Sequence, residues 1–283
     1  MLATTAIRAT KLPSGAAVPV LGQGTWRLAE GKHPREEELR ALRVGLDLGM
    51  TLIDTAEMYA DGGAEELVGE AIAGRREEVF LVSKVLPQNA TRSGTIAACE
   101  RSLRRLRTKR IELYLLHWRE SVPLQETVEA FQELVETGKI RHWGVSNFDL
   151  SDMRDLIALR FGSDVSTDQV LYNLSRRGIE YDLLPWCLEH NTPMMAYSPI
   201  EQGRMLRHPT LARIANRHDA TPAQVGLAWV LRRDKIIAIP GSGSPEHTRE
   251  NRAALDIRLT ERDLKELDRA FPPPNGPRPL EML

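Results

Sequence analysis

The sequence alternates short apolar runs with amphipathic stretches, and this unit recurs eight times at intervals of about thirty residues. The apolar runs end at about these positions: Gly24, Asp54, Lys84, His117, Ser146, Gln169, Tyr197 and Pro240. The stretch between two runs places apolar residues at helical spacing, as in residues 91–106. Eight strand-then-helix units predict an α/β fold in which a parallel sheet closes into a (β/α)8 TIM barrel.

A doubly wound open sheet is the alternative that the same alternation allows. Residues 22–24 read Gly-Gln-Gly, without the third glycine of a dinucleotide fingerprint and without an immediate helix, so we favour the barrel. We expect one domain over residues 1–283. It comprises an N-terminal β-hairpin (about 1–19, with a turn at 13–15), the barrel (about 20–259), and a C-terminal helix with a proline-rich tail (about 260–283) that covers one rim.

Composition limits the classes of protein to consider. A chain of 283 residues with 42% hydrophobic and 27% charged residues can bury a large core. The net charge of −1 provides no overall field for nucleic acid or for an anionic membrane. Two distant cysteines, no long apolar run and no apolar leader in residues 1–10 indicate a cytoplasmic protein without disulfides or structural zinc.

Ionisable residues follow three consecutive predicted strands. Asp54, Lys84 and His117 stand at strand ends, and Tyr59 follows Asp54 by five residues. Because all strands of a parallel barrel point the same way, we expect these four side chains to meet at one face. There Tyr59 could protonate a carbonyl oxygen as hydride reaches the carbon, Lys84 would lower the pKa of the phenol, and Asp54 would hold Lys84 charged. His117 would orient the carbonyl.

Each of the four residues has an ordinary alternative role when it is considered alone. Asp54 can cap a turn, Tyr59 can lie at a rim, Lys84 can extend to solvent, and His117 can be a hydrogen-bonded core residue. A strand-end lysine also suits a Schiff-base lyase. No group of residues has spacing typical of a catalytic metal site, so no metal is expected.

Four segments of the sequence resemble the signatures of the aldo-keto reductase family. They are residues 54–59 (Asp-Thr-Ala-Glu-Met-Tyr), 82–84 (Val-Ser-Lys), 115–118 (Leu-Leu-His-Trp) and 144–148 (Gly-Val-Ser-Asn-Phe). Residues 54–63 and 178–186 most resemble bacterial members that reduce methylglyoxal or other aldehydes. The resemblance implies an NAD(P)H-dependent oxidoreductase that converts aldehydes and ketones to alcohols, with Asp54, Tyr59, Lys84 and His117 as the catalytic tetrad and Tyr59 as the general acid.

The resemblance also implies a cofactor site without a Rossmann motif. Ser146, Asn147 and Gln169 would hold the carboxamide, Tyr197 would stack on the nicotinamide, and residues 198–203 would cross the pyrophosphate. The full implied set is Gly24, Thr25, Trp26, Asp54, Ser146, Asn147, Gln169, Tyr197, Ser198, Pro199, Ile200, Gln202, Gly203, Ile239, Pro240, Gly241, Ser242, His247, Glu250 and Asn251.

The adenosine end of that site departs from the family pattern. Gly241 and His247 stand where the family commonly has a lysine and an arginine that contact the 2′-phosphate. Ser242 is retained, and Arg249 is a substitute cation only if it faces the same way, which its helical position disfavours. We expect NADPH as the cofactor, with NADH or dual use left open.

The implied substrate pocket is apolar and aromatic. Its residues are Trp26, Met58, Tyr59, Leu86, His117 and Trp118. Such a wall suits a small aldehyde, and the resemblance implies small or aromatic aldehydes and 2-oxoaldehydes such as methylglyoxal as substrates. We expect a small-molecule carbonyl substrate and a monomer, or at most a weak dimer. The alternative within the same fold is a cofactor-sensing regulatory subunit.

Overall fold

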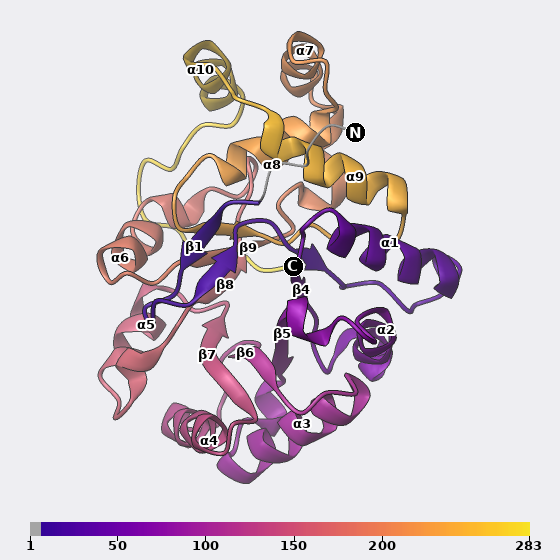
Figure 1. Ribbon diagram of the computed structural model, residues 1–283. Helices are drawn as coiled ribbons and strands as arrows, with labels where there is room; N and C mark the ends of the chain where they lie inside the picture. Colours follow the sequence, from indigo (N-terminus) through magenta and orange to yellow (C-terminus); the bar gives the residue numbers. More distant parts are fainter. Residues whose placement is uncertain (1–6) are drawn as a thin grey trace.

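Eight parallel strands lie in chain order around the molecule and helices cover their outer side (Figure 1). The computed structural model describes residues 7–283. The strands are β3 (Gln23–Gly24), β4 (Leu52–Asp54), β5 (Phe80–Val85), β6 (Ile111–Leu116), β7 (Ile140–Ser146), β8 (Asp168–Leu171), β9 (Met194–Tyr197) and β10 (Ile236–Ala238). Because each strand pairs with the next along the chain, every connection is a strand–helix–strand crossover.

The sheet closes between its first and last strands. Parallel bridges join Leu21 to Ala238 and Gly24 to Gly241, with the Gly24 amide donating to the Pro240 carbonyl at 3.0 Å. The predicted (β/α)8 barrel is therefore confirmed, and the doubly wound sheet is excluded. The glycine of β3 serves this seam, because a Cβ on Gly24 would lie 2.7 Å from the Ile239 carbonyl oxygen.

Helices follow the strands where the sequence predicts them. They are α1 (Arg35–Asp47), α2 (Gly63–Ala71), α3 (Arg92–Arg105), α4 (Leu124–Glu136), α5 (Leu150–Ile157), α6 (Leu183–Glu189), α7 (Pro209–Arg217), α8 (Pro222–Leu231), α9 (Pro245–Ala253) and α10 (Glu261–Ala270). Apolar residues at helical spacing predict a helix over residues 150–161 of the sequence, but α5 ends at residue 157, four residues earlier. Phe161 has a φ of 65°, which is incompatible with a continuing right-handed helix.

A hairpin closes the amino-terminal end of the barrel. Its strands are β1 (Ala9–Lys11) and β2 (Ala17–Pro19), and Gly15 takes a φ of 87° in the predicted turn. Leu12 and Val18 are buried in one apolar cluster with residues from inside the barrel. The hairpin is confirmed over residues 9–19, and residues 1–6 of the predicted region lie outside the described part of the chain. Because the barrel is filled from this end, a ligand can enter from the other end.

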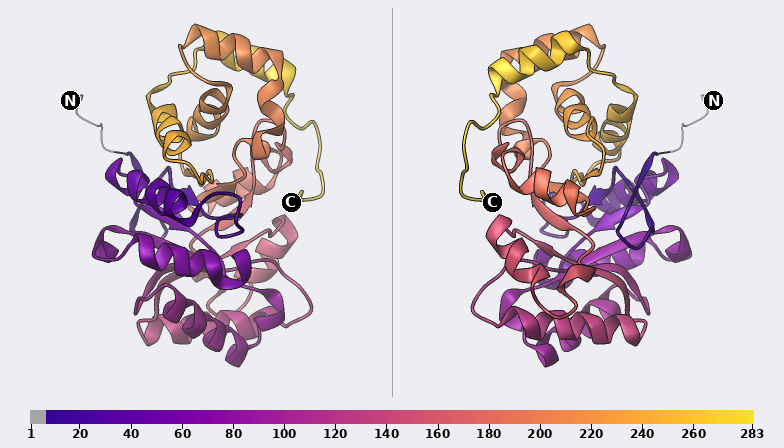
Figure 2. Two further views of the ribbon diagram at one scale, coloured as in Figure 1. Left: turned by 90° about the vertical axis from the view of Figure 1, so that its right-hand side faces the viewer. Right: turned by 90° about the vertical axis from the view of Figure 1, so that its left-hand side faces the viewer.

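The appended helix α10 lies beside α7, away from the barrel (Figure 2). The Asp263 carboxylate accepts from Arg217 Nη2 at 2.5 Å, and its other oxygen lies 2.8 Å from His218 Nε2. From α10 the chain runs back along the molecule, and its C-terminus lies beside the barrel (Figure 2). The tail thereby brings Met282 and Leu283 to the cavity that is described next.

Candidate active site

A cavity of about 600 Å³ opens at the carboxyl ends of the barrel strands. Its wall contains most of the residues that the sequence implicated: Gly24, Trp26, Asp54, Met58, Tyr59, His117, Trp118, Ser146, Asn147, Gln169, Tyr197, Ser198, Pro199, Ile200, Gln202, Gly203, Ile239, Pro240, Gly241, Ser242 and His247. The barrel thus gathers at one site side chains that are more than two hundred positions apart in sequence.

An ion pair lies at the base of this cavity. Asp54 pairs with Val82 in the β4–β5 register, and Lys84 follows Val82 by two residues, so the side chains of Asp54 and Lys84 lie on the same face of the sheet. Lys84 Nζ donates to Asp54 Oδ2 at 2.8 Å, to the Thr55 carbonyl at 2.9 Å and to Tyr59 Oη at 3.2 Å. All three ammonium protons therefore have acceptors, although the lysine side chain is fully buried.

Burial and charge act in opposite directions on Lys84 and Tyr59. Burial by itself would lower the pKa of Lys84, but the charge of Asp54 and the contact with Tyr59 raise it above its usual value. For Tyr59, burial raises the pKa, and the ammonium of Lys84 offsets that increase only in part. The sequence led us to expect a lowered phenol pKa. The structure shows the expected lowering by Lys84, but the net direction is upward because the phenol is desolvated.

His117 lies beside the phenol at the end of β6. The Tyr59 and His117 ring centroids are 5.8 Å apart in an edge-to-face arrangement, and the centroid of the Trp118 ring is 4.9 Å from that of the imidazole. Burial, followed by the charge of Lys84, holds the pKa of His117 well below its usual value. His117 is therefore neutral at neutral pH, with one ring nitrogen as a donor and the other as an acceptor.

A second group of polar side chains continues from Asp54 across β7, β8 and β9. Gln169 Nε2 donates to Asp54 Oδ1 at 2.8 Å, and Ser146 Oγ donates to the Gln169 carbonyl at 2.8 Å. Asn147 Nδ2 donates to the His117 carbonyl at 3.1 Å and its Oδ1 accepts from Tyr197 Oη at 2.9 Å. Asn147 is held in a left-handed conformation, with a φ of 59°. These bonds leave little freedom for the four side chains.

The loop after β9 is folded tightly over one side of the cavity. Ser198, Glu201 and Gln202 have φ values of 46°, 52° and 52°, which are unusual for residues other than glycine. Asn173 Nδ2 holds this loop by donating to the Ser198 carbonyl at 2.9 Å and to Glu201 Oε2 at 2.8 Å. Backbone in such conformations is typical of functional loops that present amide groups to a ligand.

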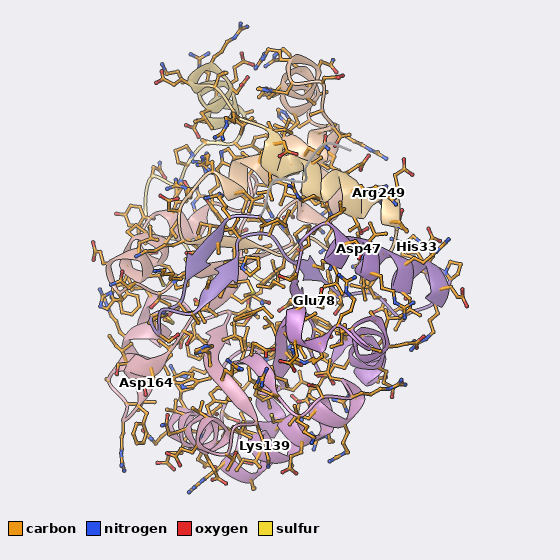
Figure 3. The ribbon with its side chains drawn as sticks, in the orientation of Figure 1. His33, Asp47, Glu78, Lys139, Asp164 and Arg249 are labelled. Atoms are coloured by element: carbon orange, nitrogen blue, oxygen red, sulfur yellow. The ribbon has the colours of Figure 1, made fainter. Side chains whose placement is uncertain are left out.

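Some of the implicated residues lie outside the cavity wall. Thr25 is buried and donates to the Asp54 carbonyl at 3.0 Å, and Lys84 lies behind Tyr59. The others are Leu86, Glu250 and Asn251. Arg249 stands on α9 with its side chain exposed, and it is not part of the wall (Figure 3).

The structure adds residues that the sequence reasoning did not name. They are Arg27, Leu28, Lys32, His33, Gly243, Met282 and Leu283. The residues between Arg27 and His33 belong to the loop from β3 to α1. Loops that follow barrel strands form the open face, so a systematic inspection of these loops could have identified them. For the tail, the sequence predicted only that it covers one rim, and the folded chain shows that Met282 and Leu283 are the residues that reach the cavity.

Over residues 7–283, no helix combines the length and apolarity needed to cross a bilayer. Among the same residues, no group of three or more histidine, cysteine, aspartate or glutamate side chains is arranged to hold a metal ion.

Comparison with known proteins identifies the family. Residues 20–271 match the model of the Aldo/keto reductase family. The chain belongs to this family of oxidoreductases. Among curated relatives of this reductase, "Methylglyoxal reductase YeaE" of Escherichia coli (strain K12) is 51% identical over 272 residues, which cover 94% of this chain and 96% of the relative. "Glyoxal reductase" of Bacillus subtilis (strain 168) is 31% identical over 277 residues, 96% of each chain.

Solved structures of aldo-keto reductases share the fold over nearly the full length. A reductase from Klebsiella pneumoniae in complex with NADP and acetate is 51% identical, with a TM-score of 0.95 over 98% of this chain and 99% of that one. An aldo-keto reductase of the same organism in complex with NADPH has a TM-score of 0.94 and 50% identity, over 99% of this chain and 100% of that chain. The resemblance that the four sequence segments indicated is therefore confirmed at the level of the family.

Proposed function

We propose that this aldo-keto reductase uses NADPH to reduce small aldehydes, including 2-oxoaldehydes such as methylglyoxal, to alcohols. The observation that carries the proposal is the hydrogen bond of 3.2 Å between the buried ammonium of Lys84 and the hydroxyl of Tyr59 at the base of the cavity. Relatives named as methylglyoxal and glyoxal reductases, and neighbours solved with NADP or NADPH, support the substrate class and the cofactor.

The cavity residues fit a nicotinamide dinucleotide. Ser146, Asn147 and Gln169 present hydroxyl and amide groups on one side of the cavity, where a carboxamide can bond. Tyr197 offers a ring, and the left-handed turn around Gln202 offers backbone amides to a diphosphate. We propose Gly24, Trp26, residues 198–203, residues 239–242 and His247 as further cofactor contacts. When bound, the reduced nicotinamide supplies the hydride that adds to the carbonyl carbon.

We assign the proton to Tyr59. Its hydroxyl lines the cavity, so it can donate to the alkoxide that forms as the carbonyl carbon is reduced. A phenol that loses this proton becomes a buried anion, which is costly unless a cation lies beside it. Lys84 is that cation, and Asp54 at 2.8 Å keeps it charged and in place. Lys84 and Asp54 therefore lower the free-energy cost of the proton transfer from Tyr59, although Lys84 itself does not contact the substrate.

His117 can orient the carbonyl because it is neutral. A neutral imidazole can donate one hydrogen bond to the carbonyl oxygen without delivering its proton, so it does not compete with Tyr59 as the acid. A charged imidazole would also repel the nearby ammonium of Lys84. We therefore propose that His117 positions the substrate and that its low pKa keeps this role constant across neutral pH.

The side chains around the tetrad suit a small apolar substrate. Trp26 and Met58 line the cavity and are 37% and 39% exposed, and the ring of Trp118 in the same wall lies 4.9 Å from the imidazole of His117. Met282 and Leu283 add apolar surface from the tail. Such a wall removes water from the reacting carbon and gives few polar groups for a large hydroxylated substrate.

A Schiff-base lyase is disfavoured by the surroundings of Lys84. A nucleophilic lysine must be accessible and uncharged. Lys84 Nζ is buried, bonds to three acceptors and has a raised pKa. The regulatory alternative shares the same cofactor site, so measured turnover decides between it and the reductase.

We also propose that residues 7–283 fold as one domain, because one apolar cluster extends from Val20 to Leu267 and includes residues of every strand from β4 to β10. A monomer in the cytoplasm, without a nucleic-acid partner, is consistent with the balanced charge and with two free buried cysteines.

The test is the fall in NADPH absorbance when the purified protein meets methylglyoxal and a panel of small and aromatic aldehydes. We expect turnover, and we expect Tyr59→Phe to lower kcat by about 10²–10⁴-fold while NADPH binding is retained. Tyr181→Phe is the matched control, because Tyr181 is 48% exposed and lies outside the cavity wall. No turnover across the panel by a protein that binds NADPH would contradict the reductase, and near-native kcat in Tyr59→Phe would contradict the assigned acid.

A further inference from the structure

One end of the cavity lies between the loop from β3 to α1 and the segment between β10 and α9. The second segment contributes Gly241, Ser242, Gly243 and His247 to the wall, none of which carries a permanent positive charge. The Ser242 hydroxyl is engaged within its own turn, since its Oγ donates to the Ser244 carbonyl at 2.7 Å and accepts from the Ser244 amide at 3.2 Å. This segment alone is therefore a poor site for a phosphate dianion.

The opposite loop brings the missing charge to the same end. Among residues 7–283, two lysine or arginine residues line the cavity, namely Arg27 and Lys32. The Arg27 guanidinium is engaged by its neighbour, because it lies 4.4 Å from the centroid of the Trp26 ring. Lys32 is exposed, and within the described chain it forms no ion pair with a carboxylate. Its ammonium is therefore available to an anionic ligand.

His33 fixes where this loop meets the other segment. A Cβ added to Gly243 would lie 2.5 Å from His33 Cδ2 and 3.1 Å from its Nε2, so the imidazole packs directly on the backbone that follows Ser242. The packing of α1 along α9 holds the two segments together (Figure 1), and Figure 3 shows His33 close to where α1 begins. Lys32, the preceding residue, is thereby carried to the end of the cavity that Ser242 and His247 also line.

We propose that Lys32 and His33, acting across the cavity from Ser242 and His247, form the subsite for the 2′-phosphate of NADPH and so determine the preference for NADPH over NADH. This inference rests on the proposed cofactor. The ligand is a phosphate monoester dianion on a ribose, which calls for a cation and several hydrogen-bond donors. NADH has a hydroxyl at that position, so residues that contact only the phosphate discriminate between the two cofactors without affecting the rest of the binding.

The test is a set of binding titrations, followed by tryptophan fluorescence or calorimetry, with NADPH, NADH and the fragments adenosine 2′,5′-bisphosphate and 5′-AMP. For Lys32→Gln we expect the affinities for NADPH and for the bisphosphate to fall about five- to tenfold, with those for NADH and 5′-AMP changed less than about twofold. Gly243→Ala should act in the same direction, because the added methyl group displaces His33. Arg249→Gln is the matched control on α9, and we expect it to change neither affinity.

Each result has a distinct meaning. An unchanged ratio of NADPH to NADH affinity in both Lys32→Gln and Gly243→Ala would overturn the subsite, and so would an equal loss in Arg249→Gln. A wild-type protein that binds NADH as tightly as NADPH would also overturn it, while turnover of aldehydes with NADH would keep the reductase. A wild-type protein that binds neither nucleotide would overturn the proposed function itself.

Discussion

Replacing Lys84 by methionine separates the role of its charge from the space that its side chain fills. Methionine retains most of the length and the apolar character of the lysine side chain, so no large cavity opens. The change removes three hydrogen bonds, to Asp54, Thr55 and Tyr59. It also leaves the carboxylate of Asp54, which is 2% exposed, with the amide of Gln169 at 2.8 Å but without its cation.

The cost of this change follows from the burial of the pair. Breaking a buried ion pair by removing one partner costs about 3–5 kcal/mol, because an uncompensated charge remains in a medium of low polarity. For a chain of this size that corresponds to a fall in Tm of roughly 6–20 °C. Because the uncompensated charge of Asp54 causes this loss of stability, removing that charge should recover part of it. We therefore expect the double variant Asp54→Asn/Lys84→Met to be more stable than Lys84→Met by about 2 kcal/mol or more.

The assay is urea unfolding at neutral pH, followed by circular dichroism, on the wild type, both single variants and the double variant. Lys139→Met is the matched control. Lys139, which is labelled in Figure 3, pairs with Glu100 at 2.5 Å. Both side chains of this pair are partly exposed, so its loss should shift the unfolding midpoint little. A double variant as destabilised as the sum of the two single variants would refute the reasoning, and so would a Lys84→Met midpoint within error of the wild type.

Three further predictions concern other parts of the chain. Burial raises the pKa of Cys99 to about 12 and that of Cys187 higher still, so we expect neither thiol to react with a thiol reagent until the protein unfolds; rapid labelling of the native protein would contradict this. Burial alone would raise the pKa of Asp263, but hydrogen bonds from α7 and from its own cap hold the pKa well below its usual value. The stability that Asp263 contributes is therefore present above pH ~4 and lost as the pH falls below it, so unfolding of Asp263→Asn should depend less on pH in this acid range than that of the wild type. Glu281 in the tail pairs with Arg176, which also holds Glu201 of the loop after β9 at 3.1 Å. Glu281→Gln should raise KM for aldehydes more than it lowers kcat, and an unchanged KM would show that the tail does not depend on this contact.

The amino-acid sequence by itself determined the architecture and which side chains the proposed tetrad would bring together. Eight apolar runs with crossover helices have few ways to bury their faces, and closing the sheet sends every strand end to one side. Asp54, Lys84 and His117 could therefore be brought together from their positions alone. Gly24 was also identified from the sequence as a strand end. Only the structure shows why a glycine stands there, since a side chain would collide with the Ile239 carbonyl at the barrel seam.

The tertiary structure decided what depends on burial and on contacts between loops. The pKa of Tyr59 is raised rather than lowered because desolvation outweighs the charge of Lys84, and no sequence pattern measures desolvation. The position of Lys32 at the far end of the cavity depends on how His33 packs against Gly243, and the return of Met282 depends on the path of the tail. Strand and helix periodicity is a local property of the chain, whereas desolvation and loop contacts are sums over neighbours that only the folded chain brings together.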